Sequence, residues 1–289
     1  MKLDGRRESS HVEDRRRMSG GKVAGLGLGG IVIVGLITLL MGGDWGDVLD
    51  AVSQSDELQT TSAACEQGAR TEEEQELASF SRKILAGTED IWTALFAEQG
   101  LEYRSPTMVL YTGTTSSGCG NANSSVGPFY CSADERLYID LSFFSSMKQQ
   151  LGADGDFAYA YVIAHEVGHH VQHLLGTLDK AHRTMARQDK VSANKTSVRI
   201  ELQADYLAGM WAKNDNAEYK SLEDGDLEEA IRCASVIGDD YLQKKAQGYV
   251  VEDAFTHGTA RQRMRWLKAG LTYGDFAHAD TFSVSETQL

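Results

Sequence analysis

The chain contains little proline and has few positive charges relative to its negative ones. Only two of its 289 residues are proline and 42% are hydrophobic, which suits one globular domain of about 200 residues with an appendage. Asp and Glu outnumber Lys and Arg by 42 to 28, giving a formal charge of −14. An acidic chain of this kind argues against a nucleic-acid partner.

Cysteine is also scarce, and the four cysteines lack the close spacing of a zinc knuckle, which excludes that type of metal site. Their even number permits disulfides if the domain lies outside the cytoplasm. Cys119 and Cys131 would close a glycine-rich loop, which leaves Cys65 to pair with Cys233. Buried free thiols are the alternative.

Residues 23–43 carry no charged side chain and are long enough to span a bilayer, which needs about 20 residues. A cleaved signal peptide is the alternative, but no Ala-x-Ala-like cleavage site follows directly. Residues 1–22 hold seven Lys or Arg, and Asp44, Asp47 and Asp50 follow the apolar stretch. The positive-inside rule then predicts a single-pass membrane protein. Its basic N-terminus (residues 1–22) would be cytoplasmic, and its folded domain periplasmic or extracellular.

The clearest functional signal is His165-Glu166-Val-Gly-His169. On a helix, residues four apart lie on one face about 6 Å apart, so both histidines could bind one Zn²⁺. Glu166 would lie beside the open coordination position, where it could act as general base. Asp154 or Asp156 could cap this helix at its N-terminus, and Gly176 would end it. An incidental pair of histidines on a surface helix is the alternative.

A catalytic zinc site needs a third protein ligand, which we assign to Glu201. His173 lies about 12 Å along the helix from His165, too far for the same ion. The metzincin pattern fails because Val171 and Leu175 occupy its positions. Glu201 lies on an apolar segment, where an unpaired carboxylate would be costly. Asp205, one turn on, would accept the free ring N–H of a ligand histidine. A helix salt-bridged through Arg199 or Lys213 is the alternative.

These motifs resemble the gluzincin arrangement of two histidines and a downstream glutamate. More closely, the chain resembles the bacterial family of putative neutral zinc metallopeptidases. The shared pieces include Gly127-Pro-Phe-Tyr-Cys131, His165-Glu-Val-Gly-His-His-Val-Gln172, Glu201-Leu-Gln-Ala-Asp205 and Phe255-Thr-His257-Gly. The resemblance covers nearly the whole chain. It implies one zinc ion, a peptide or protein substrate, and a substrate-pairing strand at residues 136–143 just before the active-site helix. It also implies that the membrane is the bacterial inner membrane.

The remaining pattern predicts an α+β fold, mostly helical and zincin-like, with a small β-sheet, after one transmembrane helix. We expect a linker at residues 44–75, the peptidase domain at 76–275 and a disordered tail at 276–289. Residues 107–112 and 137–141 read as strands, and 226–247 as one helix. Thr259 and Gln262 predict a capping box for a helix that ends at Gly270. We expect the following basic residues on its solvated face: Arg261, Arg263, Arg265 and Lys268.

His257 precedes that helix and could donate a hydrogen bond to an oxyanion, or could be a hydrogen-bonded structural histidine. Together the residues predict a membrane-anchored zinc metallopeptidase. Two other functions fit the same ligands: a zinc-dependent amidase acting on cell-wall peptides, and a zinc-stabilised membrane adaptor with little activity.

Overall fold

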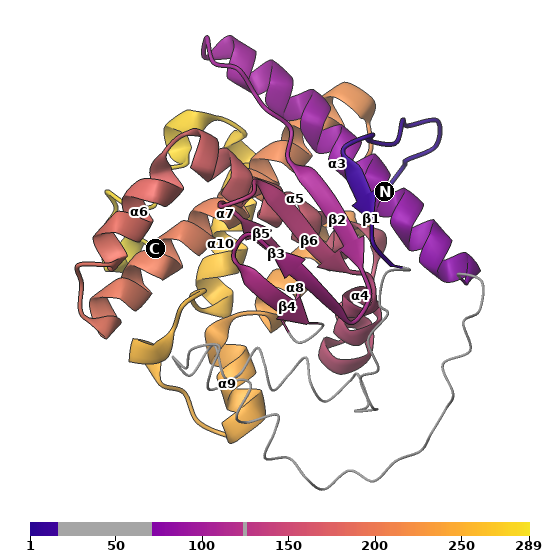
Figure 1. Cartoon of the computed structure of the whole chain (residues 1–289). Coiled ribbons are helices and arrows are strands. Elements are labelled where there is room, and N and C mark those ends of the chain that lie inside the picture. Colours follow the sequence, from indigo (N-terminus) through magenta and orange to yellow (C-terminus); the bar gives the residue numbers. More distant parts are fainter. Residues whose placement is uncertain (17–70, 124–125) are drawn as a thin grey trace, which may run out of the picture.

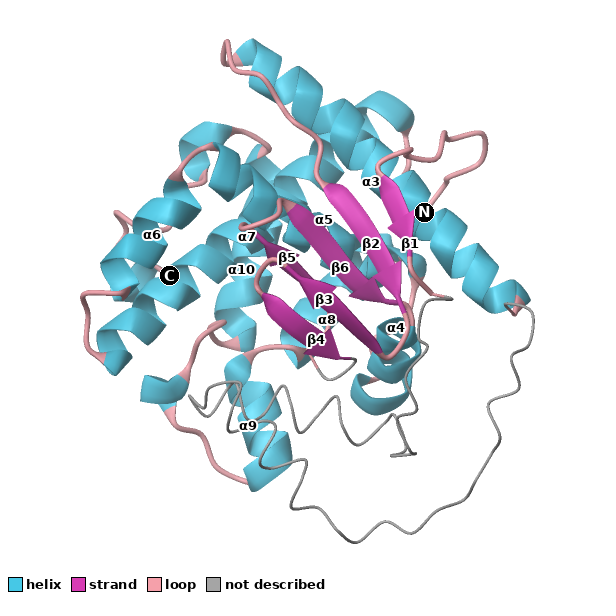
Figure 2. Cartoon of the chain, in the orientation of Figure 1, coloured by secondary structure: helices cyan, strands magenta, loops and turns pink. Residues whose placement is uncertain are grey.

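The computed structural model describes residues 1–16, 71–123 and 126–289. It has the predicted mixture of many helices and a small sheet, which Figure 2 shows with the sheet on one side of the helices. The α+β class is therefore confirmed. Among these residues no helix is both long enough and apolar enough to cross a bilayer. The predicted span at residues 23–43 and most of the predicted linker lie outside the described residues.

The main sheet has four strands in the order β1-β2-β6-β5. β1 (Val12–Asp14), β2 (Thr107–Tyr111) and β6 (Arg136–Asp140) are parallel, and β5 (Phe129–Cys131) is antiparallel to β6. β3 (Thr114–Ser117) and β4 (Gly120–Asn123) form a separate hairpin. Both predicted strands are confirmed. The expectation that residues 136–143 pair with substrate is wrong, because β2 and β5 occupy both edges of β6. In the described part of the chain, β1 and β5 are the two edge strands of this sheet.

The helices of the described residues follow in chain order, and several are longer than average for globular proteins. They are α3 (Glu72–Glu98), α4 (Ser142–Ser146), the π-helix η1 (Met147–Leu151), α5 (Asp156–Leu174), α6 (Thr177–Met185), α7 (Lys190–Tyr219), α8 (Asp226–Val236), α9 (Asp239–Gln247), α10 (Ala260–Tyr273), and the 3₁₀ turns η2 (Glu252–Ala254), η3 (Phe276–His278) and η4 (Glu286–Gln288).

Helices α5, α7 and α10 form the interior of the domain. The apolar stripe of α5, including Ile163, Val167 and Val171, is buried against the core, which also takes in Met108 and Ile139 of the sheet. α7 contacts both α5 and α10. α7 and α10 approach closely at Gly209 and Gly270, where a Cβ on Gly270 would lie 2.0 Å from the Tyr206 carbonyl oxygen. Close packing of these helices fixes the residues they carry relative to one another.

The first sixteen residues belong to the same folded body as residues 71–123 and 126–289. β1 pairs with β2, and Arg6 Nη2 lies 2.8 Å from Asp215 Oδ1 on α7. Residues 1–16 of the predicted N-terminal segment 1–22 therefore pack against the domain. Strand β1 was not predicted because its three residues are too few to show alternation.

Three further boundaries differ from the predictions. The predicted helix 226–247 is two helices, because it breaks at Gly238, where a Cβ would lie 2.2 Å from Ala260 N. The Thr259–Gln262 capping box is confirmed, but α10 runs on to Tyr273 and its C-cap is Gly274. The tail is ordered: Arg199 donates to the Val284 carbonyl, and Gln203 to the Ala279 carbonyl.

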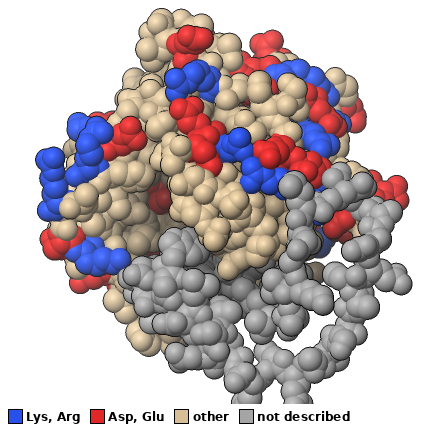
Figure 3. Space-filling view, in the orientation of Figure 1, with Lys and Arg blue, Asp and Glu red and all other residues tan. Residues whose placement is uncertain are grey.

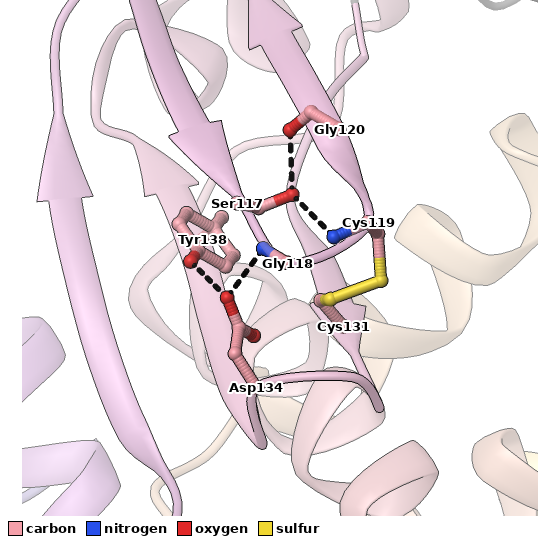
Figure 4. The surroundings of a disulfide bond; sticks show 7 residues. All are labelled: Ser117, Gly118, Cys119, Gly120, Cys131, Asp134 and Tyr138. Atoms are coloured by element: carbon pink, nitrogen blue, oxygen red, sulfur yellow. Dashed lines mark hydrogen bonds between the residues drawn. A yellow bond between two sulfur atoms is a disulfide. The ribbon is translucent and has the colours of Figure 1, made fainter.

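The predicted Cys119–Cys131 disulfide is confirmed, with the two Cα atoms 5.8 Å apart. Figure 4 shows it tying the turn between β3 and β4 to the end of β5. The predicted Cys65–Cys233 bond is wrong, because Cys233 is a fully buried free thiol whose Sγ lies 3.6 Å from Met147 Sδ. Cys65 itself lies outside the described residues.

Candidate metal centre

Helix α5 carries the histidine motif and begins at Asp156 after Gly155. Neither Asp154 nor Asp156 caps it by a side-chain hydrogen bond, so that prediction is wrong. α5 ends at Leu174, and Gly176 with φ 75° lies in the turn that leads to α6. His165, Glu166 and His169 are therefore all on one continuous helix, as the spacing predicted.

Helix α7 brings Glu201 to the two histidines. Glu201 Oε2 lies 3.1 Å from His165 Nε2, and Glu201 Oε1 lies 3.6 Å from His169 Nε2. One ligand atom from each of the three residues falls within 4.8 Å of the others. Donors at roughly 2.0–2.2 Å from one tetrahedral ion stand roughly 3.3–3.5 Å apart, so this cluster needs only small shifts to hold Zn²⁺. Two imidazoles and one carboxylate also suit zinc chemically.

The ring of His165 is held from behind by Asp205. His165 Nδ1 lies 2.8 Å from Asp205 Oδ1, so the hydrogen-bond network assigns the Nδ1–H donor and leaves Nε2 free for an ion. Tyr161 Oη donates to the same oxygen at 2.6 Å. Burial tends to lower the pKa of His165, but the charge and hydrogen bond of Asp205 outweigh burial and raise this pKa to about 9.

Asp205 is itself paired with Arg263 of α10, whose Nε and Nη2 each lie 2.9 Å from its carboxylate. Both side chains are buried, at 0% and 5% exposed. Burial tends to raise the pKa of Asp205, yet Arg263 and His165 lower it to about 2. The expectation that Arg263 lies on a solvated face is therefore wrong, whereas Arg261, Arg265 and Lys268 are exposed as expected.

The ring of His169 is held by Gln172, one turn further along α5. His169 Nδ1 lies 2.9 Å from Gln172 Oε1, which makes Nδ1 the donor and leaves Nε2 facing Glu201. The amide of Gln172 is fixed in turn, because its Nε2 donates to the Ile200 carbonyl and to Gln203 Oε1 on α7. Gln172 is fully buried. Each candidate histidine ligand thus has its own buried acceptor.

Glu166 lines a cavity of about 580 Å³ together with His165, His169 and Glu201. Much of the remaining wall is apolar, including Leu178, Met185, Ile200, Ile237 and Leu242. Figure 3 shows a hollow on this face with acidic atoms at its floor and mostly uncharged atoms around it. Burial raises the pKa of Glu166 above its ordinary value.

His257 lines the same cavity and is oriented by Asp239, the first residue of α9. His257 Nδ1 lies 3.2 Å from Asp239 Oδ1, while Asp239 Oδ2 accepts the backbone N–H of His257 at 2.7 Å. Burial tends to lower the pKa of His257, but the hydrogen bond to Asp239 and the charge of Glu201 raise it. His257 is therefore a hydrogen-bonded histidine that lines the same cavity as the three candidate ligands.

The two other histidines of α5 are outside the cluster. His173 lies 3.5 Å from Glu135 and 3.4 Å from Asp179, consistent with its rejection as a ligand. His170 is buried between Tyr130 Oη and the Arg104 carbonyl, and burial lowers its pKa to about 4. A neutral, fully bonded His170 is a structural residue that positions β5 against α5.

Two histidines and a glutamate thus converge on one point that could hold a metal ion, and a second glutamate lines the same cavity. Residues 1–282 match the family described as "Putative neutral zinc metallopeptidase", and the chain belongs to this family. It is 47% identical to "Uncharacterized protein YpfJ" of Escherichia coli K12 over 292 residues, covering 99% of this chain and all of the relative. It is 41% identical to "Uncharacterized protein Rv2575" of Mycobacterium tuberculosis over 64% of each chain. No solved structure matches it significantly.

Sequence reasoning missed four site residues: Tyr161, Gln172, Asp239 and Arg263. Gln172 had a signal, because it lies three positions after His169 and such pairs share a helix face. Arg263 had none, since it lies 58 residues from Asp205 in sequence. Only the packing of α10 on α7 brings Arg263 and Asp205 together.

Proposed function

We propose that the protein is a zinc-dependent peptidase in which His165, His169 and Glu201 hold the ion and Glu166 is the general base. The observation that carries this proposal is the convergence of the three ligand atoms within 4.8 Å, in a cavity that Glu166 also lines. Zinc bound there would act as a Lewis acid, which would lower the pKa of a bound water molecule and polarise a carbonyl oxygen.

The chain's own residues would then handle the protons and the developing charge. Glu166 takes a proton from the attacking water and passes it to the leaving amine. His257, fixed through Nδ1 by Asp239, donates a hydrogen bond from Nε2 to the oxyanion in its protonated form, which carries N–H on both ring nitrogens and which its raised pKa favours. Asp205 and Gln172 keep the ligand histidines in the tautomer that presents Nε2 to the ion.

The cavity and the sheet edge suggest the class of substrate. An apolar wall beside the cluster favours peptides with an apolar side chain next to the scissile bond. The described edge strand β5, whose Phe129 and Tyr130 line the cavity, offers backbone groups to an extended peptide. Hydrolysis of a peptide bond, rather than binding alone, is favoured because Glu166 would have no role at a closed structural site.

Membrane attachment through residues 23–43 remains a proposal, based on their uncharged sequence. Extraction of membranes of an expressing bacterium with alkaline carbonate tests it. A protein that stays with the membrane supports attachment, and full release argues against it.

A peptide-library assay on the full chain, with metal analysis, tests the peptidase proposal. We expect the wild type to contain about one zinc per chain and to cleave beside apolar residues. Glu166→Gln should keep the zinc and lose at least about 10²-fold in turnover, in the range for general acid–base catalysis. A Glu166→Gln variant with full activity would remove Glu166 from the mechanism, and zinc-loaded wild type without any cleavage would favour the adaptor.

A further inference from the structure

The first residues of the chain form a strap, residues 2–16, that is bound along the catalytic domain. Its strand β1 is the outer strand of the main sheet as described, with Val12 beside Met108 and Asp14 beside Leu110 of β2. Met108 N donates to the His11 carbonyl at 2.9 Å, and Arg15 N to the Leu110 carbonyl at 2.7 Å. Figure 1 shows β1 between β2 and α3. The strap therefore completes the sheet.

The strap also supplies partners to buried carboxylates of two helices. Arg6 pairs with Asp215 of α7, whose side chain is 1% exposed, and the Arg6 guanidinium lies 3.7 Å from the centre of the Tyr219 ring. Glu89 of α3 is 6% exposed and accepts from Arg7 at 2.9 Å and from Ser9 Oγ at 2.5 Å. Buried carboxylates without such partners would be strongly destabilising. The domain is thus built to hold this strap.

The far end of the strap lies beside the point where the described chain resumes. Arg16 Nη1 donates to the Glu74 carbonyl at 2.8 Å, in the first turn of α3. Arg16 is also fixed by Asp14, with Nη2 and Oδ2 2.6 Å apart. Residues 17–70 therefore connect two points on the same side of one folded body.

We infer that the strap and the catalytic domain occupy one compartment, so that residues 17–70 make no net membrane crossing. Strand pairing and buried ion pairs cannot form across a hydrocarbon core of about 30 Å. Residues 23–43 therefore cannot be a single span with the N-terminus on one side and the domain on the other. Any crossings in residues 17–70 must be even in number, none included.

The basic residues that predicted a cytoplasmic N-terminus have another explanation in the fold. Arg6 pairs with Asp215, Arg7 with Glu89 and Asp90, Arg15 with Glu13, and Arg16 with Asp14. Four of the seven Lys and Arg in residues 1–22 thus serve the strap and its docking. The Cys119–Cys131 disulfide favours an oxidising compartment for the domain, and therefore for the strap.

Single engineered cysteines in the full chain test the inference. Ser10→Cys reports on the strap and Glu98→Cys on the end of α3; both native side chains are exposed. Each is made in a Cys65→Ser background, where Cys233 is buried and Cys119 is bonded to Cys131. Spheroplasts are treated with a membrane-impermeant maleimide, and lysed spheroplasts show that each thiol is reactive in the folded protein. A cytoplasmic protein with an exposed cysteine controls for leakage.

We expect both positions to react before lysis, to within about twofold of their reaction after lysis. Protection of both until lysis would still support one compartment and would place it in the cytoplasm. Reaction of one position with protection of the other would overturn the inference. The result does not depend on peptidase activity or bound zinc, so failure of the proposed function would leave it unaffected.

Discussion

Glu201 is the residue on which the two histidines converge, and its environment differs from that of a surface glutamate. Burial tends to raise its pKa, but the charge of His169 and the hydrogen bonds from both histidines hold that pKa well below its usual range. A carboxylate kept ionised between two imidazoles is a suitable third ligand for zinc. His173, which lies on α5 with the two histidines, contacts acids outside the cavity instead.

We therefore predict that Glu201→Ala loses most of the bound zinc and all detectable hydrolysis, because two histidines alone give an incomplete ligand set. His173→Ala should keep both. Metal content after dialysis and cleavage of a reporter peptide measure the two effects. Stoichiometric zinc in Glu201→Ala together with loss of zinc in His173→Ala would show that the ligand assignment is wrong.

Gln172 provides a second prediction at the level of single residues. Removing its side chain leaves His169 Nδ1 without its acceptor, so Gln172→Ala should weaken zinc binding by about 10- to 100-fold. Competition with a fluorescent chelator measures the affinity. Gln203→Ala is the matched control, because it removes a partner of Gln172 but leaves the His169–Gln172 bond in place. Equal losses in the two variants would argue against a role for Gln172 in orienting His169.

The site residues that could be predicted are those that share a short motif. His165, Glu166 and His169 follow from helical spacing, and Glu201 and Asp205 from the cost of burying acids on an apolar helix. The pairing of Asp205 with Arg263 could not be predicted, because the four basic residues of α10 look alike in sequence. Their separation into one buried and three exposed side chains depends on how α10 packs against α7.

At the scale of whole elements, the α7–α10 contact determines whether Arg263 reaches Asp205. We predict that Gly270→Ala destabilises the domain by about 1–3 kcal/mol or more, the usual cost of overpacking, because the new Cβ meets the backbone of Tyr206 and Met210. This should exceed the roughly 1 kcal/mol that alanine gains over glycine in a helix. Thermal unfolding should show a lower Tm, whereas Thr272→Ala on the exposed side of α10 should change it little. An unchanged Tm for Gly270→Ala would mean that the two helices are not in close contact.

Several elements could be predicted and others could not, for identifiable reasons. β2 and β6 show alternation, and the capping box at Thr259 marks a helix start. β1 is three residues long and depends on β2 for its partner, so its sequence shows no alternation, and the arginines on either side of it dominate the charge of the strap. The same charge in the strap led to the predicted cytoplasmic N-terminus, and charge counts do not distinguish a membrane flank from the partner of a buried carboxylate.

At the scale of the whole molecule, the site joins parts of the chain that are far apart in sequence. His165 and Glu201 belong to different helices, Arg263 to a third, and Gln203 connects the site to the ordered tail at Ala279. A ligand bound between α5 and α7 therefore holds together most of the interior of the domain. Zinc should accordingly affect the stability of the entire fold as well as its chemistry.

We predict that zinc raises the Tm of the metal-free protein by about 5–10 °C. An ion that binds only the folded state at 100 times its Kd adds about 2.7 kcal/mol, and 1 kcal/mol corresponds to about 2–4 °C for a domain of this size. Calorimetry of chelator-treated protein, with and without added zinc, measures the shift. The metal-free domain should still unfold cooperatively, because His165 and His169 lie 3.1 and 3.6 Å from Glu201 and partly neutralise its charge.

The control variants separate this site from others: Glu201→Ala should show little increase in Tm with zinc, and His173→Ala the full increase. The same increase in Tm for Glu201→Ala would mean that the stabilising ion binds elsewhere on the chain.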